Sequence, residues 1–555
     1  MSHPKEHPAV SMDGPAPSRD LYVQMALSYL PHLTHLVDRN PYSPTYGCFD
    51  REYWHYRTLD FPCGMSQEFV LPFALLYKNA YPGNLYQGWD RLREVAEAGI
   101  RFAVTGSHRD GTCDDYFPWE QAMGALVFST YACTEAYQIL GLQDDRLVEF
   151  FRKRGDHLAL HNETGRLTNH QAFAALAAYN IYQVTGDDKY RRVAEDRTAL
   201  ALSWQHPEEG WFQEYEGADP GYHTCTIAFL AKLYQKNRDE SLLKPLLKAV
   251  EFAWHFMHPD GSYGGEYGSR NTYHFYPHGF EVLAPHSVKA GQIADQFLRG
   301  AARGKRYHND DDRMCCHLVY DWLQAYEAYH PVRPEPINAR PDFSVWMPDA
   351  GLAVVKTPAY YAVANLRKGG VFKAFTAEHC IASDTGLIGE TDDGQVVVSH
   401  LMDEQHEVEA DTRRRVYRVE GALSRRQRKL SSPVKVIVFR MVNLTISRFF
   451  PNLVRSLVQK LLITGKNRTR WRFKRTLEFG SDRIRVRDRF FEAVPFKRLS
   501  AGSDATSIYV ANSNVYQESV LRCPWTHAPE ALVSEIRTKG GVWDREIRPG
   551  SAGAK

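Results

Sequence analysis

Three absences narrow the classes of protein to which this 555-residue sequence can belong. No apolar run approaches the roughly 18–20 residues of a transmembrane helix, so no membrane-spanning segment is predicted. The polar, proline-broken start, Met1–Pro8, lacks the apolar core of a secretion signal, and this predicts a cytoplasmic location. The nine cysteines form no Cys-x-x-Cys pair, which argues against a zinc ribbon or a disulfide framework and fits a reducing compartment.

Several common catalytic signatures are missing as well. The sequence contains no phosphate-binding glycine loop, no serine nucleophile elbow and no HExxH metal motif. We therefore expect no redox or nucleotide cofactor. The acidic run Asn309-Asp310-Asp311-Asp312 leaves two alternatives open, a structural divalent cation or a cap on the helix that follows, and the cap is favoured.

Charge is present but unevenly distributed. The net charge is +2, yet residues 412–500 hold 25 Lys and Arg against five Asp and Glu. A concentration of one sign of charge on this scale predicts a polyanionic partner, namely an acidic polysaccharide, nucleic acid or an anionic membrane, or else a solvated basic face. Acidic polysaccharide is favoured. Nucleic acid is not expected, because no recognition module is visible and the basic residues fall on predicted strands.

The hydrophobic pattern divides the chain. Eleven amphipathic segments with apolar residues at three- and four-residue spacing lie between residues 20 and 330, and this predicts an (α/α) toroid of paired helices. A proline-rich linker covers 331–341, and an alternating pattern over 342–549 predicts a basic antiparallel β-sandwich. The ends, 1–19 and 550–555, are expected to be disordered. The predicted fold class is α+β with several domains.

Two short segments of the second half have an ambiguous pattern. Residues 434–438, Val-Lys-Val-Ile-Val, are interpreted as a strand. Residues 449–462 are interpreted as a basic amphipathic helix. Such a helix could make peripheral contact with a membrane, cover the edge of a cleft, or pack on the sandwich, and the last of these is favoured.

Polar residues open two of the predicted helices. Asn169 and His170 begin an Ala-rich helix, and Tyr222 follows His170 by 52 residues within Pro-Gly-Tyr-His, at the start of the next helix but one. Helices stacked in a ring would bring these side chains into one cleft. An amide, an imidazole and a phenol are the groups that proton abstraction beside a carboxylate requires.

A helical ring followed by a β-sandwich, with Asn-His and then Tyr at this spacing, resembles the heparinase II/III-like and alginate-lyase-like polysaccharide lyases. The resemblance implies that Asn169, His170 and Tyr222 are catalytic and that the sandwich supplies one further histidine. His379 is the best candidate, although only it and Asp384 remain of the family's His-x-His-x-Asp pattern, at altered spacing.

The implied reaction is β-elimination at a uronic acid. Asn169 would neutralise the uronate carboxylate as the enolate forms, and His170 or Tyr222 would remove the C5 proton. Tyr222 would then protonate the departing C4 oxygen. A tyrosine needs a nearby cation to act as a base at neutral pH, and Arg270 could supply it.

Other residues are candidates for substrate binding through charge, hydrogen bonds or sugar stacking. They are Glu266, Arg270, Asn271, His274, Trp54 and Tyr116. Carboxylates between Asp114 and Glu120 could instead form the acid–base pair of a glycoside hydrolase, although caps for the following helix are favoured. A uronyl C5-epimerase and a non-catalytic protein that binds an anionic glycan remain open as alternatives to the lyase.

Overall fold

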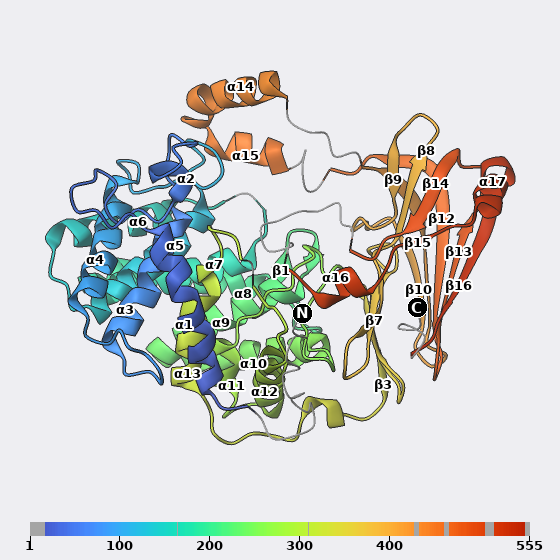
Figure 1. The fold of residues 1–555 in the computed structure, drawn as a ribbon, viewed down its shortest axis with the longest axis horizontal. Helices are drawn as coiled ribbons and strands as arrows, with labels where there is room; N and C mark the ends of the chain where they lie inside the picture. The colour runs from blue at the N-terminus through green and yellow to red at the C-terminus, as the bar shows by residue number, and fades with distance from the viewer. Residues whose placement is uncertain are drawn as a thin grey trace, which may run out of the picture.

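The computed structural model describes residues 17–163, 165–308, 310–426, 432–459, 465–504 and 515–549. A helical part occupies one end of the molecule and two antiparallel β-sheets the other (Figure 1). The expected α+β fold class is thereby confirmed. The expectations for residues 1–16 and 550–555 lie outside the described residues.

The helical part is a double ring. Within the described residues, each inner helix contacts the next, and α13 closes the ring on α3. The inner helices are α3 (Val70–Lys78), α5 (Met123–Ile139), α7 (Thr168–Thr185), α9 (Pro220–Asn237), α11 (His278–Leu283) and α13 (Cys316–Ala328). The outer helices are α4 (Asp90–Thr105), α6 (Asp145–Leu160), α8 (Asp188–Ser203), α10 (Leu243–Ala253), α12 (Val288–Ala302) and α1 (Asp20–Leu36).

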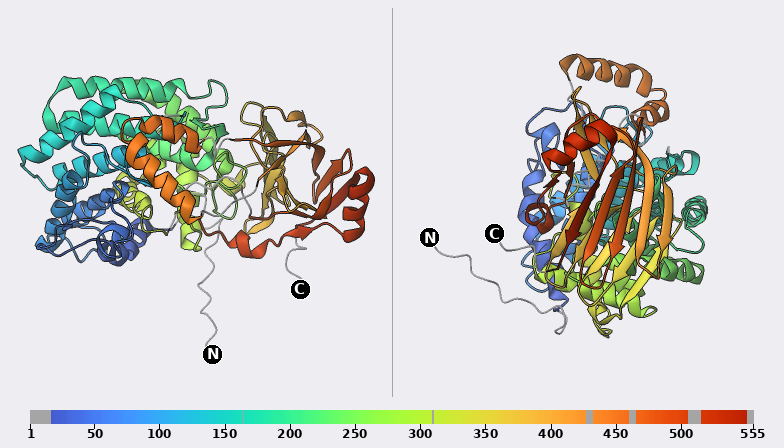
Figure 2. Two further views of the ribbon diagram at one scale, coloured as in Figure 1. Left: turned by 90° about the horizontal axis from the view of Figure 1, so that it is seen from above. Right: turned by 90° about the vertical axis from the view of Figure 1, so that its right-hand side faces the viewer.

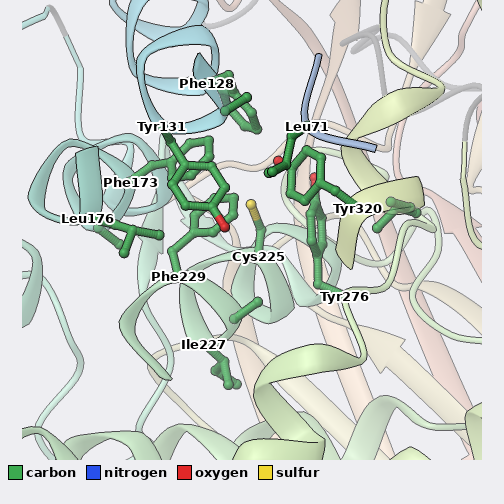
Figure 3. Close-up of a cluster of buried hydrophobic side chains, with 14 of the residues drawn as sticks. Leu71, Phe128, Tyr131, Phe173, Leu176, Cys225, Ile227, Phe229, Tyr276 and Tyr320 are labelled. Carbon is green, nitrogen blue, oxygen red and sulfur yellow. The ribbon is translucent and has the colours of Figure 1, made fainter. Parts of the chain in front are cut away.

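Composition explains which helices lie inside. The inner helices α5, α7 and α9 carry small or apolar residues on nearly all sides, as expected for helices enclosed by others. Their aromatic rings meet at the axis of the ring, where Phe173 and Phe229 stack with centroids 3.7 Å apart (Figure 3). The outer helices α4 and α10 instead have one apolar stripe and one polar face.

The β part consists of two packed sheets. The five-stranded sheet runs in order through β3 (Phe343–Met347), β4 (Leu352–Lys356), β5 (Tyr361–Asn365), β6 (Val371–Phe375) and β7 (Cys380–Asp384). The nine-stranded sheet contains β8 (Leu387–Thr391), β9 (Val396–Val398), β10 (Glu407–Asp411), β11 (Val416–Arg425), β12 (Arg468–Phe479), β13 (Ile484–Phe490), β14 (Phe496–Ala501), β15 (Thr526–His527) and β16 (Gly541–Ile547).

The five-stranded sheet is the middle layer of the molecule. Val354 and Val363 on one face join the core of the helical ring, while Val355 and Phe372 on the other join the core between the sheets. Strands β5 and β6 are accordingly buried along their whole length. Strands buried on both faces lack the alternation of a half-exposed strand.

The basic residues of the nine-stranded sheet lie on its outer side. Along β13, Ile484 and Val486 are buried, whereas Arg485, Arg487 and Arg489 alternate with them and are exposed. The five-stranded sheet therefore separates these arginines from the helical ring. The strand alternation that predicted the sandwich also places much of its positive charge away from the inner helices.

A helical hairpin lies apart from both layers. It consists of α14 (Pro433–Val442), the π-helical turn η5 (Asn443–Ser447) and α15 (Pro451–Gln459), and it rises at the edge of the molecule in Figures 1 and 2. The prediction of a strand at 434–438 was therefore wrong. Ser432, whose side chain accepts from the Lys435 amide, and Pro433 form a helix start that outweighs the β-branched valines.

The hairpin, over the residues 432–459 that the structure describes, packs on the helical ring, whereas packing of 449–462 on the sandwich was predicted. Within 449–459 the contact with the ring is made by Arg455, and residues 460–462 lie outside the described part. Phe439 meets Phe117 with ring centroids 5.4 Å apart, and the Arg448 guanidinium lies 4.7 Å from the Trp119 ring centroid. The search for membrane spans, made over the described residues, found no helix with the length and hydropathy to cross a bilayer.

Candidate active site

The inner helices begin on a common face of the ring. Each is followed by an outer helix that returns, so successive inner helices run parallel. The partial positive charge of their N-termini therefore accumulates on this face, where it favours an anionic ligand. His170 stands in the first turn of α7 and Tyr222 in the first turn of α9.

Asn169 is held by a buried carboxylate. Its Nδ2 donates to both oxygens of Glu214 at 2.8 and 2.9 Å, and its backbone amide donates to the same group at 3.0 Å. Asn169 Oδ1 is buried and has no hydrogen-bond partner among the described residues. An unpartnered buried acceptor on this face is open to a ligand donor.

His170 is oriented by a second carboxylate. Its Nδ1 donates to Glu163, and the ring is partly exposed. Burial raises the pKa of Glu163, but His170, Arg455 and Arg270 outweigh burial and hold that pKa below its usual range. Because Nδ1 is hydrogen-bonded to Glu163, Nε2 is the ring nitrogen of His170 that can exchange a proton with a ligand. The ring lies beside Gly124, where a Cβ would approach its Cε1 to 3.1 Å.

Tyr222 is positioned by the cap of its own helix. Asp219 accepts from the Tyr222 amide at 3.1 Å through one oxygen and from the Arg270 amide at 2.8 Å through the other. The Thr272 hydroxyl also donates to Asp219. One carboxylate therefore fixes both the start of α9 and the loop 264–274 that follows it by some fifty residues.

A cation and an imidazole pack on the Tyr222 ring. The Arg270 guanidinium carbon lies 3.8 Å from the ring centroid, and the His274 ring centroid lies 4.5 Å away at a steep angle. Arg270 Nη1 also reaches Glu214 at 3.1 Å. Burial raises the pKa of Glu214, and Arg270 and Asn169 counteract part of that rise. Asn169, Glu214, Arg270, Tyr222 and His274 are hereafter the Tyr222 cluster.

His274 is a buried neutral base within this cluster. Burial, and then the charge of Arg270, lower the pKa of His274 well below its usual range. Neither ring nitrogen has a hydrogen-bond partner among the described residues. Burying an imidazole without hydrogen-bond partners lowers the stability of the fold, unless a ligand or a water molecule bonds to its nitrogens. His274 thus marks the inner wall of the site.

Glu266 and Asn271 of the loop 264–274, which were predicted to bind substrate, have partners in the β part. Glu266 pairs with Lys373 of β6 at 2.9 Å, and Asn271 accepts from Lys368 of the sandwich. Lys368 also donates to the carbonyls of Glu266 and Gly268, the latter at 2.6 Å. Burial lowers the pKa of Lys368 to about 7. These contacts fasten the loop to the β part.

The two aromatic residues predicted to bind substrate, Tyr116 and Trp54, have different surroundings. Burial and then Asp115 raise the pKa of Tyr116, whose ring centroid lies 5.7 Å from the Arg313 guanidinium carbon and which is 55% exposed as a whole residue. Trp54 belongs to the short helix α2 (Arg51–Trp54), and its Nε1 donates to the Leu36 carbonyl at the end of α1. None of the described contacts of Trp54 reaches the Tyr222 cluster.

His379 is also separate from the cluster. It lies in the turn between β6 and β7, where its amide donates to Thr376 and its Nδ1 stands 3.9 Å from Glu378. No described contact joins it to the cluster. Another histidine of the sandwich, His400, is buried behind Lys368, and burial followed by that charge lowers the pKa of His400 to about 3.

The carboxylates before α5 hold the loop 114–121 together, and none of them caps the helix, whose N-cap Ala122 makes no side-chain hydrogen bond. Asp114 accepts from the amides of Trp119 and Gln121, and Glu120 accepts from those of Asp115 and Tyr116. Burial and the neighbouring Asp115 nevertheless raise the pKa of Glu120 to about 7, against the charge of Arg455.

Arg455 comes from the hairpin and reaches this face. Its guanidinium lies 3.6 Å from Glu120 and 3.7 Å from Glu163, and it donates to the carbonyls of Glu120 and Gln121. The hairpin therefore covers the edge of the site, which was one of the alternatives for 449–462. The sequence analysis missed Arg455, Glu163 and Glu214, because nothing in their local pattern distinguishes them from surface charges.

The acidic run has partners other than a cation. Asp310 accepts from Tyr29, Asp311 accepts from the Met314 amide at 2.7 Å, and Asp312 pairs with Arg51 at 2.6 Å. Among the described residues, His206, Glu209 and Asp349 bring potential metal-ligand atoms within 4.8 Å of one another. Glu209 already accepts from Trp211 Nε1 and from the amides of Asp349 and Ala350.

A separate cavity lies between the ring and the β part. Asp260, Lys305, Lys373 and Cys380 line it, and its lining includes no residue of the Tyr222 cluster. Its shape therefore says nothing about how the cluster would hold a ligand.

Comparisons with known proteins identify the architecture. The sequence matches none of the family models and none of the curated proteins with which it was compared. Its structure is similar to xanthan lyase of Paenibacillus, with a TM-score of 0.53 and 10% identity over 88% of this chain and 48% of the other. It is also similar to chondroitin AC lyase of Streptomyces coelicolor A3, with a TM-score of 0.50 and 11% identity over 87% of this chain and 68% of the other.

The chain spans about half the length of the xanthan lyase that it matches. At identities this low, the similarity establishes the fold alone. The protein therefore shares with these two lyases a helical toroid joined to antiparallel β-sheets.

Proposed function

We propose that this protein is a polysaccharide lyase that cleaves a uronate-containing acidic polysaccharide by β-elimination. One observation carries the proposal: Tyr222 stands on Arg270 at the start of one inner helix, beside Asn169 and His170 at the start of its neighbour. The fold supports it, since the two similar structures are named as lyases of xanthan and of chondroitin.

The difficult step is removal of the C5 proton, because the electrons left behind must enter a carboxylate that is already negative. The N-termini of α7 and α9 and the buried charge of Arg270 provide fixed positive potential where this enolate would form. Asn169 is committed to Glu214 before substrate arrives. We therefore infer that His170 and the amides of the helix start bind the uronate carboxylate first. Asn169 donates to that carboxylate only after one of its N–H groups has broken its hydrogen bond to Glu214.

Two groups can exchange protons with the sugar. His170 Nε2 is the atom of that ring that Glu163 leaves for chemistry. The Arg270 guanidinium carbon lies 3.8 Å from the centroid of the Tyr222 ring, and a cation near a tyrosine favours its phenolate form. In the proposed reaction one of the two takes the C5 proton, the C4–O bond breaks, and Tyr222 delivers a proton to the departing C4 oxygen. The C4–C5 double bond forms on the uronate itself, which becomes the new non-reducing end of the fragment that keeps the original reducing end.

The test is ultraviolet absorbance of 4,5-unsaturated uronate during incubation with a panel of uronate polysaccharides. We expect wild-type protein to produce the signal and Tyr222→Phe to lower the rate by about 10²–10⁴-fold, the usual contribution of a positioned acid–base group. Tyr234→Phe is the matched control, because its hydroxyl lies on the same helix and binds Glu240. Equal rates for Tyr222→Phe and Tyr234→Phe would refute the assignment of Tyr222.

The same preparation separates the alternatives. Deuterium uptake at C5 without unsaturated product would indicate a uronyl C5-epimerase. A glycoside hydrolase would release reducing ends without unsaturation, and Glu120 is its best acid because burial holds the pKa of this carboxyl at about 7. In that case Glu120→Gln, and not Tyr222→Phe, would abolish turnover.

A further inference from the structure

The hairpin 432–459 presents an apolar surface that nothing in the described structure covers. No residue of α14 is buried. Val434, Ile437, Val438 and Met441 of this helix are 54–69% exposed, and Phe449 and Phe450 at the start of α15 are 70% and 63% exposed. A helix that is apolar on all sides is normally enclosed by protein or lipid, and contiguous patches of this kind mark interaction sites.

The charge of the hairpin narrows the choice of occupant. Residues 432–459 contain four Lys and Arg and no Asp or Glu. Within the hairpin, Lys435 and Arg448 are exposed beside the apolar side chains. Aliphatic and aromatic groups flanked by basic groups, without acidic ones, are the composition of helices that lie in the interface of an anionic bilayer.

We propose that the hairpin 432–459 docks the protein on an anionic membrane surface. A soluble polysaccharide would pair with the basic groups but leave the apolar ones in water. A second copy of this chain, meeting through the same surface, would bring two basic segments together without a counter-charge. A bilayer with anionic headgroups satisfies both kinds of group at once.

The docking surface lies on the same side as the candidate active site. Arg440 pairs with Asp60, and Arg455 bridges Glu120 and Glu163, so the hairpin is fastened to the ring segments that precede α3, α5 and α7. Seen from above, α14 and α15 overlie the helical part (Figure 2). Docking would therefore hold the Tyr222 cluster near the lipid surface, where a membrane-attached acidic glycan would be presented. This last consequence rests on the proposed function; the docking itself does not.

The experiment is co-sedimentation of the full chain with vesicles of phosphatidylcholine, with or without phosphatidylglycerol, at low and moderate salt. We expect binding to the phosphatidylglycerol vesicles that weakens as salt rises. The double variant Ile437→Asp, Phe449→Asp is expected to bind at least about tenfold more weakly, because two side chains that enter the interface become charged. Failure of the wild-type protein to bind anionic vesicles would overturn the proposal.

Two controls keep the outcome specific. Leu160→Asp changes a side chain that is 78% exposed on α6, outside the hairpin, and is expected to bind as the wild type does. Equal binding by the double variant and Leu160→Asp would overturn the assignment to the hairpin. So would sedimentation of vesicle-free wild type as a dimer that the double variant dissociates. Tyr222→Phe is expected to dock normally, so failure of the lyase proposal would leave this result unchanged.

Discussion

Arg270 is the residue through which the candidate site is connected. It packs on Tyr222, lies 4.7 Å from the Tyr215 ring centroid, and bonds Glu214, which in turn holds Asn169. Burial lowers the pKa of Arg270, but the two tyrosines and Glu214 outweigh it and raise that pKa. A buried guanidinium enclosed by rings and a carboxylate is a fixed charge, and a fixed charge needs no reorganisation during a reaction.

Replacing Arg270 tests this arrangement. Arg270→Lys keeps the charge but loses the flat face on Tyr222 and the link to Glu214. We expect kcat/KM to fall about 10- to 100-fold and the acidic limb of its pH profile to move to higher pH, because a less closely held cation favours the phenolate less. Rate–pH profiles of both proteins measure this. An unchanged profile with a lower rate would mean that Arg270 acts on binding alone.

At the scale of elements, the site depends on how helices begin. The Asp219-Pro220 pair starts α9 and places Tyr222 in its first turn, because an Asp cap followed by Pro suits the unpaired amides of a helix start. The same carboxylate holds the loop 264–274. Within this loop Gly264 has a positive φ of 68°, and a Cβ there would lie 2.3 Å from the Thr272 carbonyl oxygen. The glycine permits the loop to fold on itself.

Asp219 therefore has a dual effect. Asp219→Ala removes three acceptor contacts, and we expect it to lower the free energy of unfolding by about 1–3 kcal/mol and to reduce activity. Asp219→Asn keeps one acceptor oxygen and should recover part of both losses. Urea unfolding and initial rates measure the two effects. Full activity in Asp219→Ala would show that the helix start does not position Tyr222.

For the whole molecule, the decisive feature is the shared middle layer. The five-stranded sheet contributes Val354 to the core of the ring and Val355 to the core of the sandwich. Tyr361 of β5 also donates to the His255 carbonyl of the helical part at 2.6 Å. Because the interface is a continuous apolar core, the two parts are expected to unfold together.

A single substitution in this layer tests the coupling. We expect one calorimetric transition for the wild type, and Val354→Asp should move the whole transition to lower temperature, because a buried carboxylate without a partner destabilises both layers. Val542→Asp on β16, where the side chain is 38% exposed, is the control and should change little. Two separate peaks, with one unaffected by Val354→Asp, would show that the domains unfold independently.

The predictions that held depend on local pattern. The change from helical to alternating periodicity predicted the two-part fold, and the structure confirms it. The start of α7 at Thr168 and of α9 at Pro220 also follows from neighbouring residues. The prediction of a strand at 434–438 was wrong because these five β-branched or long residues fit a strand and a helix equally well. The helix cap Ser432, which lies outside the run, decided between them.

By itself the sequence determined the change from paired helices to antiparallel strands, and it put Asn169, His170 and Tyr222 at helix starts. Only the tertiary structure assigned their partners. Glu214 reaches Asn169 from 45 residues away, Arg270 reaches Glu214 from 56, and Arg455 reaches Glu120 across 335. Capping and periodicity act within one or two turns of chain, so sequence patterns report them directly. The partner of a buried charge is decided by which segments meet when the ring closes and the hairpin packs on it. No local sequence pattern specifies these long-range contacts.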